Sequence, residues 1–511
     1  MVKAVVGEET RLQLAEDRLS RSSLPAQVGL VIGKLSSTLD RGFVFDLVPT
    51  PQNDAGQPAC SVIEAAKDDK KKGPKSKSQA TDTSSLIIDK DWVAEHARQV
   101  SRMLVGGMNV VGVYVWASEA SFKNSALVLC QTIKGVADAA SMLEADLDER
   151  LLIHICYSPR RWACRNCTLS SNVTSNSLRP CDFKMGRVLT SLQTFKCLYN
   201  FDLRLPIYCE SASNSQTLSD ILRHRISVYA KELRSAKALI DGNLVVDAET
   251  CTTDGLHEVE LLQPFMKDTY IEACSQKDIV GVLVFTGSVC SFAHLNSKEP
   301  ISQAIADIKG DIIRSLQSRL DILCDEADGD LGPSDNGNRE SSNEASSEKP
   351  VSQLVLHSLR KVCNLAFPRR VFVPWLMGTY VCDYQQPSET FEVVKDHCVE
   401  LMSMEPPNDT STILEPEAEA PTAITGSFWD SVPPFSSSME KSKENPKVVN
   451  AQKAVKSNNI KFIAAVFVLL LSIIFGYRSF PRTFNICCKT IPWLTTAISF
   501  SGRVHNLQKR L

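Results

Sequence analysis

The sequence has almost no net charge, and this absence limits the partners that the protein can attract. Among its 511 residues, 56 are Lys or Arg and 59 are Asp or Glu, which gives a formal net charge of -3. A protein that binds nucleic acid through its backbone phosphates needs a basic surface. We therefore expect no nucleic-acid partner. With 43% hydrophobic residues the chain has enough apolar material for two or three ordinary domains.

The common catalytic motifs are also missing. GLVIGK resembles the end of a phosphate-binding loop, but Val28 replaces the required glycine and Leu35 the required hydroxyl. The sequence contains no G-x-S-x-G. His154 lies near Cys156, and His397 precedes a cysteine, but the sequence identifies no third group to orient either pair. These histidines are therefore interpreted as packing residues, and no cofactor is expected.

A secretory signal is absent as well. The first twenty residues, MVKAVVGEETRLQLAEDRLS, do not combine a basic start with an apolar core. The 17 cysteines are scattered through apolar runs, as in LVLC ending at Cys130, a pattern typical of free thiols in a reducing compartment. The folded part is therefore expected to face the cytosol.

One cysteine group has the spacing of metal ligands. Cys164 and Cys167 form a C-x-x-C pair, and Cys156 and Cys181 could complete four thiolates. The flanking gaps are uneven and a second tight pair is missing. A zinc site and a loop of reduced thiols both remain open.

A single long hydrophobic run lies near the C-terminal end. Residues 462–477, FIAAVFVLLLSIIFGY, carry no charge, and we expect a transmembrane helix over 460–478 followed by a short tail over 479–511. The run is slightly short, which suits a thin endoplasmic reticulum bilayer. Basic residues flank both ends, so charge does not decide the orientation. A buried core helix is the alternative interpretation.

Polar segments divide the rest of the chain. An insertion loop is expected over 67–85, a disordered insert over 325–350 and a disordered stalk over 405–459. The stalk contains an aromatic pair, Phe428 and Trp429, in GSFWDS. Because nothing local would bury these rings, they are a candidate docking motif.

The folded blocks are predicted to be mixed α/β (α+β). In the block 1–157, the apolar runs 28–35 and 42–49 predict a hairpin, and helix 92–104 leads into strand 110–116, then a helix near 127–136 and a strand from Leu151. In the block 158–404, we expect a strand at LPIYCE, a helix over 218–240, a hairpin over 279–295 bending at Thr286 and Gly287, a helix from Pro300, and strands over 368–376 and 379–384.

The series VGLVIGK, VFDLVPTPQND, an amphipathic helix ending in ML with glycines, and VVGVYVW resembles the MPN (JAMM) domain of metal-dependent deubiquitinases and their scaffold relatives, over about 25–157. The resemblance implies that catalytic members place a glutamate base before the first strand and H-x-H-x7-S-x2-D after the V-G-W-Y segment. Carried onto this sequence, the glutamate position is Ala26, the two histidine positions are Val115 and Ala117, the serine is Ser125 and the aspartate position is Val128. Only Ser125 matches, so an inactive MPN-like domain without metal is expected.

The MPN-like start, HICYSPRRWACRNC, PRRVFVPWL followed by CDY, the stalk and the late hydrophobic span are together similar to the Odr-four-like family of membrane proteins. That resemblance implies a non-enzymatic, single-pass adaptor in the endoplasmic reticulum membrane. It would assist the trafficking of G-protein-coupled or other multi-span receptors and recruit the cysteine protease of the ubiquitin-fold modifier. A soluble-complex MPN scaffold and a divergent metallo-isopeptidase are the alternatives. Helices 92–104 and 301–323 are further candidate contact surfaces, unless their apolar stripes face the chain's own core.

Overall fold

The computed structural model describes most of the first of two compact units, Met1–Pro433 and Pro434–Leu511. The described residues are 2–36, 39–63, 84–141, 149–169, 174, 177–208, 218–245, 255–262, 279–329, 367–387, 389–407, 409–420 and 424–427. The predicted span 460–478, the tail 479–511, and Phe428 and Trp429 lie outside them. Within these ranges, none of the helices combines the length and the apolar character that crossing a membrane requires.

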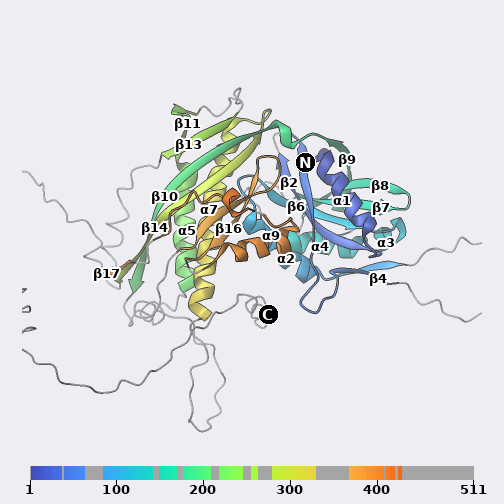
Figure 1. Ribbon diagram of the computed structural model, residues 1–511, viewed down its shortest axis with the longest axis horizontal. Coiled ribbons are helices and arrows are strands. Elements are labelled where there is room, and N and C mark those ends of the chain that lie inside the picture. The colour runs from blue at the N-terminus through green and yellow to red at the C-terminus, as the bar shows by residue number, and fades with distance from the viewer. Residues whose placement is uncertain are drawn as a thin grey trace, which may run out of the picture. The chain divides into compact units, whose positions relative to one another are not determined.

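Seven strands near the N-terminus form a closed barrel in the order β1-β3-β2-β6-β7-β8-β9 (Figure 1). They are β1 (Ala4–Glu8), β2 (Gln27–Ser36), β3 (Arg41–Pro49), β6 (Asn109–Trp116), β7 (Glu149–Tyr157), β8 (Arg160–Thr168) and β9 (Leu178–Gly186). The β2–β3 pair confirms the predicted hairpin. β1 closes the barrel because it pairs in parallel with both β3 and β9. The predicted domain limit at residue 157 therefore falls inside the barrel, which extends to Gly186.

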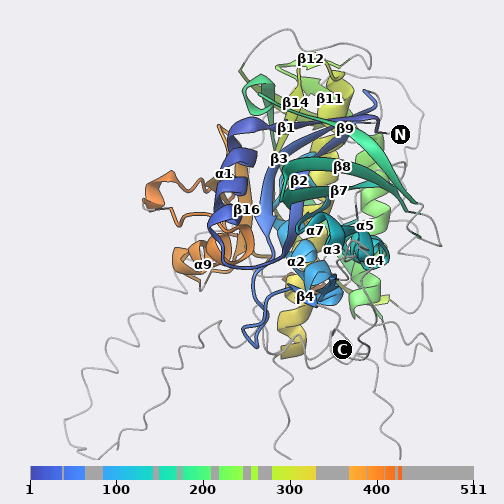
Figure 2. The same cartoon turned by 90° about the vertical axis from the view of Figure 1, so that its right-hand side faces the viewer.

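The N-terminal residues of the chain contribute to this barrel, although the sequence pattern had predicted no strand or helix there. After β1 comes α1 (Glu9–Arg21), whose Leu12, Ala15 and Leu19 are buried at helical spacing. Figure 2 shows α1 near β1 and β3, and its buried side chains belong to the same apolar cluster as residues of the barrel strands. The segment that was examined only for a signal peptide is thus a strand and an amphipathic helix.

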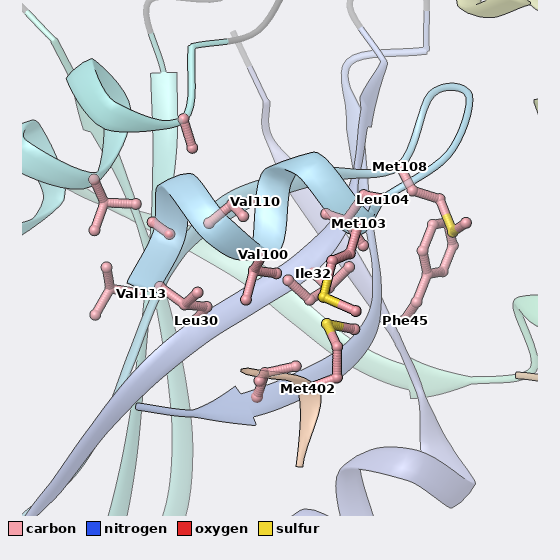
Figure 3. Packing of buried hydrophobic residues seen from close by; sticks show 14 of the residues in the cluster. Leu30, Ile32, Phe45, Val100, Met103, Leu104, Met108, Val110, Val113 and Met402 are labelled. Atoms are coloured by element: carbon pink, nitrogen blue, oxygen red, sulfur yellow. The ribbon is translucent and has the colours of Figure 1, made fainter. Parts of the chain in front are cut away.

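Helix α2 (Lys90–Met103) packs its apolar face into the chain's own core. Asp89 accepts a hydrogen bond from the backbone N–H of Trp92 at 3.1 Å and so caps the N-terminus of this helix. Val93, Ala97, Val100 and Met103 are buried. Figure 3 shows Met402 of α9 (Phe391–Met402) pointing toward Met103, beside Leu30 and Ile32 of β2. Of the two possibilities for helix 92–104, the structure confirms that the apolar stripe faces the chain's own core.

Two further helices cover the barrel, and a small sheet lies beside them. α3 (Glu119–Asn124) and α4 (Ala126–Ala139) follow β6 directly. The antiparallel strands β4 (Cys60–Ile63) and β5 (Ser85–Ile88) flank the predicted insertion loop 67–85, of which only Ser84 and Ser85 are described.

A second sheet of six strands is covered by two long helices. Its order is β12-β11-β13-β10-β14-β17, and its members are β10 (Leu192–Tyr208), β11 (Lys237–Ile240), β12 (Asn243–Leu244), β13 (Leu256–Leu262), β14 (Ile279–Asn296) and β17 (Ile424–Ser427). α5 (Leu218–Ser235) and α7 (Ile301–Gly329) lie along this sheet in Figure 1. The predicted helix 218–240 ends at Ser235, and its last residues form β11.

The predicted hairpin over 279–295 is wrong, because β14 is one continuous strand. It pairs antiparallel with β10 over nearly its whole length, with Gly287 opposite Phe201. A Cβ atom at Gly287 would lie 2.8 Å from the Phe201 ring. Gly287 thus makes room for an aromatic side chain on the neighbouring strand rather than forming a turn.

Helix α7 confirms the predicted apolar stripe, and this stripe is buried. Ile308, Ile312, Leu316 and Leu323 are at most 1% exposed and belong to the core between α7 and the second sheet. For helix 301–323, too, the structure confirms the possibility that the stripe faces the chain's own core. The helix continues to Gly329, so the predicted insert 325–350 begins too early, and residues 330–350 lie outside the described part of the chain.

The strands β15 (Arg369–Pro374) and β16 (Tyr380–Gln385) confirm the two apolar runs predicted there. They join the barrel to the second sheet, because Leu104 bridges Val381 and the Phe292 ring contacts the Phe372 ring edge to face at 5.0 Å. A buried ion pair joins the same parts: Lys34 of β2 lies 2.7 Å from Asp307 of α7.

The predicted stalk 405–459 begins too early. Leu414 forms a β-bridge with Phe372, and Glu417 is 2% exposed. The Glu417 carboxylate accepts hydrogen bonds from the Arg319 guanidinium at 2.6 Å and from the backbone N–H groups of Cys290 and Arg370, each at 2.7 Å. Residues 409–420 are therefore part of the folded unit, held by partners that are distant in sequence.

A second buried ion pair completes this network. Arg370 donates two hydrogen bonds to Asp311, each of 2.8 Å, and both side chains are 1% exposed. Charge-assisted pairs of this two-point geometry fix orientation as well as charge. The network therefore sets the relative position of α7, β14, β15 and the 409–420 segment.

His96 gives the fold an expected sensitivity to acid. Its imidazole is 3% exposed, and Nε2 donates to the Leu401 carbonyl at 2.8 Å, which ties α2 to α9. Burial lowers the pKa of His96 from 6.5 to about 4, although the hydrogen bond to Leu401 opposes this shift. Because the folded pKa is depressed, this contribution is complete above pH 6.5 and is lost as the pH falls through about 4.

We expect the His96→Gln variant to lose less stability on acidification than the unchanged chain, by up to about 3 kcal/mol. Urea unfolding at pH 7 and at pH 4.5 would measure the difference. The exposed His224→Gln variant is the matched control and should keep the original pH dependence. Equal acid sensitivity of the His96→Gln variant and the unchanged chain would contradict this assignment.

Candidate functional site

The five positions that the MPN resemblance assigns to a metal site lie at the end of β6, the start of β2 and the start of α4. Gln27 pairs with Trp116, which places the start of β2 beside the end of β6. Four of the five positions lie in or against one apolar cluster: Ala26, Val115 and Ala117 within it, and Val128 packed on it. Here these four residues form part of the hydrophobic core.

Ser125, the one position that keeps the MPN residue, has a structural role. Its hydroxyl is 2% exposed and accepts the backbone N–H of Leu86 at 2.7 Å, which attaches β5 to α4. Nearby, Ser121 shares hydrogen bonds with Ser84 at 2.7 Å and with Ser118 at 2.9 Å. The hydroxyls around these positions therefore bond to one another and to the backbone.

A second group of polar side chains lies next to this position, on β7. His154 pairs with Val115 across the β6–β7 ladder and is 1% exposed. Its Nε2 lies 3.1 Å from the Ala117 carbonyl, which can only accept, so Nε2 carries the proton and Nδ1 keeps a free electron pair. The ring stacks on Phe122 at a centroid distance of 4.0 Å. These contacts fix both the tautomer and the orientation of the imidazole.

Two more potential ligands converge on His154. The donor atoms of Glu119, in the first turn of α3, His154 and Cys156 all lie within 4.8 Å of one another. Cys156 follows His154 by two residues on β7, so both face the same side of the strand. His154 and Cys156 were interpreted from the sequence as packing residues, because the sequence pattern does not identify Glu119, 35 residues earlier, as a third ligand.

The charges around this group are mixed. Burial lowers the pKa of His154 and outweighs the hydrogen bond to the Ala117 carbonyl and the charge of Glu119, which both raise it; Arg165 and Arg161 lower it further, so the neutral imidazole is favoured at pH 7. Burial raises the pKa of the Glu119 carboxyl, but hydrogen bonds from Lys123 and Arg161 outweigh this and hold the pKa below its usual value. The site thus presents one carboxylate and one imidazole lone pair beside a buried thiol.

The four thiols considered for zinc do not come together. Cys164 lies opposite Cys181 in the β8–β9 ladder and packs inside the barrel core near α1. Cys167, three residues along the same extended strand, points to the opposite face and joins the other core cluster. Cys156 lies with Glu119 and His154. The C-x-x-C spacing predicts a metal pair in a turn, but in a strand it separates the two sulfurs.

His397 and Cys398, the second His–Cys pair, also lie in different surroundings. His397 lies 2.8 Å from the Asp383 carboxylate, which raises the pKa of the imidazole although burial opposes the shift. Cys398 is fully buried in the core, where burial raises the pKa of its thiol to about 12. A thiol in this environment is neither ionised nor accessible, so this pair is not a nucleophilic site.

Comparison with known proteins supplies the family. Residues 29–413 match the sequence model of the ODR4-like family, described as odorant response abnormal 4-like. The protein odr-4 homolog of Mus musculus is 25% identical over 502 residues, which cover 94% of this chain and 100% of that protein. The Homo sapiens homolog is 26% identical over 77% of this chain and 85% of its own length, and the Dictyostelium discoideum homolog is 22% identical over 81% of each.

Among solved structures, the crystal structure of UfSP from C. elegans matches 79% of this chain at 7% identity with a TM-score of 0.35. The match spans 57% of that structure, little more than half. A similarity this low supports no inference about fold or function.

Proposed function

This chain belongs to the ODR4-like family, and from that premise we propose that it is a non-enzymatic adaptor of the endoplasmic reticulum membrane. In this proposal it assists the trafficking and folding of multi-span receptors, among them G-protein-coupled receptors. It also recruits the cysteine protease of the ubiquitin-fold modifier to the membrane. Family membership supports the receptor role, and the resemblance of the sequence to this family is the basis for the other parts.

The observation that carries the non-enzymatic part is the burial of the former catalytic positions. Val115 and Ala117 stand where a metal-dependent MPN protein has its histidines, and both are fully buried. Ala26 stands at the position of the general base and is 1% exposed. Hydrolysis of an isopeptide bond by the MPN mechanism requires a metal-bound water within reach of substrate. Apolar residues without exposed surface supply neither.

The sequence also distinguishes the two alternative functions from the membrane adaptor. A divergent metallo-isopeptidase would need ligands at Val115, Ala117 and Val128, whose side chains cannot bind a cation. A soluble-complex MPN scaffold would not need the uncharged run 462–477. The membrane adaptor accounts for both, although this run lies outside the described residues.

The buried stripes of α2 and α7 shift the expected docking surface to the end of the folded unit. Both stripes are covered by the chain's own core, so neither offers apolar area to a partner. Strand β17 ends at Ser427, directly before Phe428 and Trp429. We propose this aromatic pair, which lies outside the described residues, as the docking motif because a short aromatic segment in a polar stretch of sequence can supply anchors for a partner.

Changing both Phe428 and Trp429 to Ala should reduce capture of the protease by at least about tenfold, since aromatic anchors dominate most interfaces. Affinity purification of the tagged full-length chain in detergent, followed by identification of bound proteins, is the measurement. Phe435→Ala, in the same part of the chain, is the matched control and should keep capture intact. If the double variant retains the protease as well as the control does, docking takes place elsewhere on the folded unit.

A further inference from the structure

We propose that Glu119, His154 and Cys156 form a binding site for a divalent cation of the zinc type. The three side chains offer one oxygen, one nitrogen and one sulfur ligand, all within 4.8 Å of one another. None of them occupies a position of the missing MPN site. The proposal concerns metal binding alone and does not rest on the adaptor function.

The chemistry of the donors selects the metal. A thiolate and an imidazole favour zinc and similar borderline ions, whereas magnesium and calcium prefer sites made entirely of oxygen ligands. Zinc with three protein ligands keeps a fourth, open position in a tetrahedral arrangement. The site therefore fits zinc with one position left for water.

The backbone and its neighbours already orient two of the ligands. His154 Nε2–H donates to the Ala117 carbonyl, and a backbone acceptor of this kind is the usual partner of a metal-bound histidine. The imidazole is also fixed by its stacking on Phe122. Cys156 is 1% exposed and lies on the same face of the same strand. The lone pair on Nδ1 is thus presented toward the thiol and toward Glu119.

Glu119 is the ligand whose side chain has room to adjust. Zinc–ligand bonds of about 2.0–2.3 Å place ligand atoms roughly 3.5 Å apart, whereas here Glu119 Oε2 lies 3.8 Å from His154 Nδ1. The Glu119 side chain is 28% exposed, so it can rotate without disturbing the core. On binding, the Cys156 thiol loses its proton to the buffer, a sulfur–metal bond forms, and no electron is transferred.

Arg161 competes with the metal for the same carboxylate oxygen. Its guanidinium lies 2.7 Å from Glu119 Oε2, the oxygen that faces His154. Lys123 lies 3.2 Å from the other oxygen, Oε1. A cation bound at Oε2 must therefore displace or share the Arg161 contact. This geometry fixes the sign of one variant: removing the Arg161 charge should strengthen metal binding.

The test uses the full-length chain, stripped with a chelator and titrated first with Zn²⁺ and then with Co²⁺ as a spectroscopic substitute. We expect one ion per chain, one proton released per ion bound, and absorption from sulfur-to-cobalt charge transfer. Cys156→Ser should abolish that absorption, and the half-exposed Glu119→Gln should weaken binding by about 10–100-fold. Arg161→Gln, at an exposed side chain, should strengthen binding severalfold.

Cys181→Ser is the control because this half-buried thiol lies outside the group, and it should leave the titration unchanged. Binding that persists in the Cys156→Ser and Glu119→Gln variants would overturn the proposal, as would the absence of any binding in the unchanged chain. Weaker binding in Arg161→Gln would contradict the assigned geometry. Since the readouts are metal content and absorption, their failure does not touch the adaptor function.

Discussion

Glu417→Ala is expected to destabilise the folded unit by about 3–5 kcal/mol, because it leaves a buried cation without its partner. The Arg319 guanidinium, 2% exposed, would lose a carboxylate at 2.6 Å. The backbone N–H groups of Cys290 and Arg370 would lose their acceptor at the same time. Urea unfolding of the full-length chain would measure the loss.

Glu415→Ala is the matched control for this variant. Glu415 lies two residues away and pairs with Arg369 at 2.7 Å, but the two side chains are 38% and 21% exposed. Partly exposed pairs of this kind contribute about 1 kcal/mol or less. If the two variants unfold at the same urea concentration, Glu417 does not hold residues 409–420 in the fold.

Lys34→Met is the second change with a large expected effect, again of about 3–5 kcal/mol. Its ammonium lies 2.7 Å from Asp307 and 3.4 Å from Glu299, and all three side chains are at most 7% exposed. Methionine fills the same volume without the charge, so two carboxylates would be left together in the interior. Because Lys34 belongs to the barrel and Asp307 to α7, the loss should appear in the joint unfolding of both.

Two further variants test this interpretation. Lys3→Met removes an exposed lysine that pairs with Asp40 and should leave the unfolding midpoint unchanged. Adding Asp307→Asn to Lys34→Met should recover part of the lost stability, because one uncompensated charge disappears. Simple addition of the two single-variant losses would show that the two groups do not interact.

Local sequence pattern predicted the elements of the fold better than their limits. Strands β2, β6 and β7 were predictable because each is a short, continuous apolar run that is buried on both faces. Helices α2 and α7 were predictable because each buries an apolar stripe at helical spacing. The hairpin over 279–295 was predicted wrongly because of Gly287. A glycine that makes room for Phe201 on the neighbouring strand cannot be distinguished from a turn glycine in one sequence. Its role depends on Phe201 of β10, which lies 86 residues earlier in the chain.

The C-terminal limit of the folded unit was predicted wrongly for an electrostatic reason. The segment around Glu417 is rich in Pro and Glu, a composition that normally stays solvated. Its carboxylate is buried because Arg319, 98 residues away, neutralises it. The same reasoning applies to Glu119, which reaches His154 only after β6, α3 and β7 have folded together. Ion pairs between distant segments leave no periodic signal in the sequence.

The corrected limit also changes how the proposed adaptor must be tested. A fragment ending at residue 404 would lack Glu417 and should not fold, so its failure to bind a partner would carry no information. Fragments of the folded unit should instead extend through β17 to Ser427.

Capture of the ubiquitin-fold-modifier protease by the full-length chain, extracted from endoplasmic reticulum membranes in detergent, tests the proposed function most directly. We expect the protease to co-purify with the unchanged chain and, at an equal level, with Phe435→Ala. The purified chain alone should cleave no isopeptide bond. A chain that resides in these membranes and is fully folded, but retains no protease or itself cleaves an isopeptide substrate, would contradict the adaptor function.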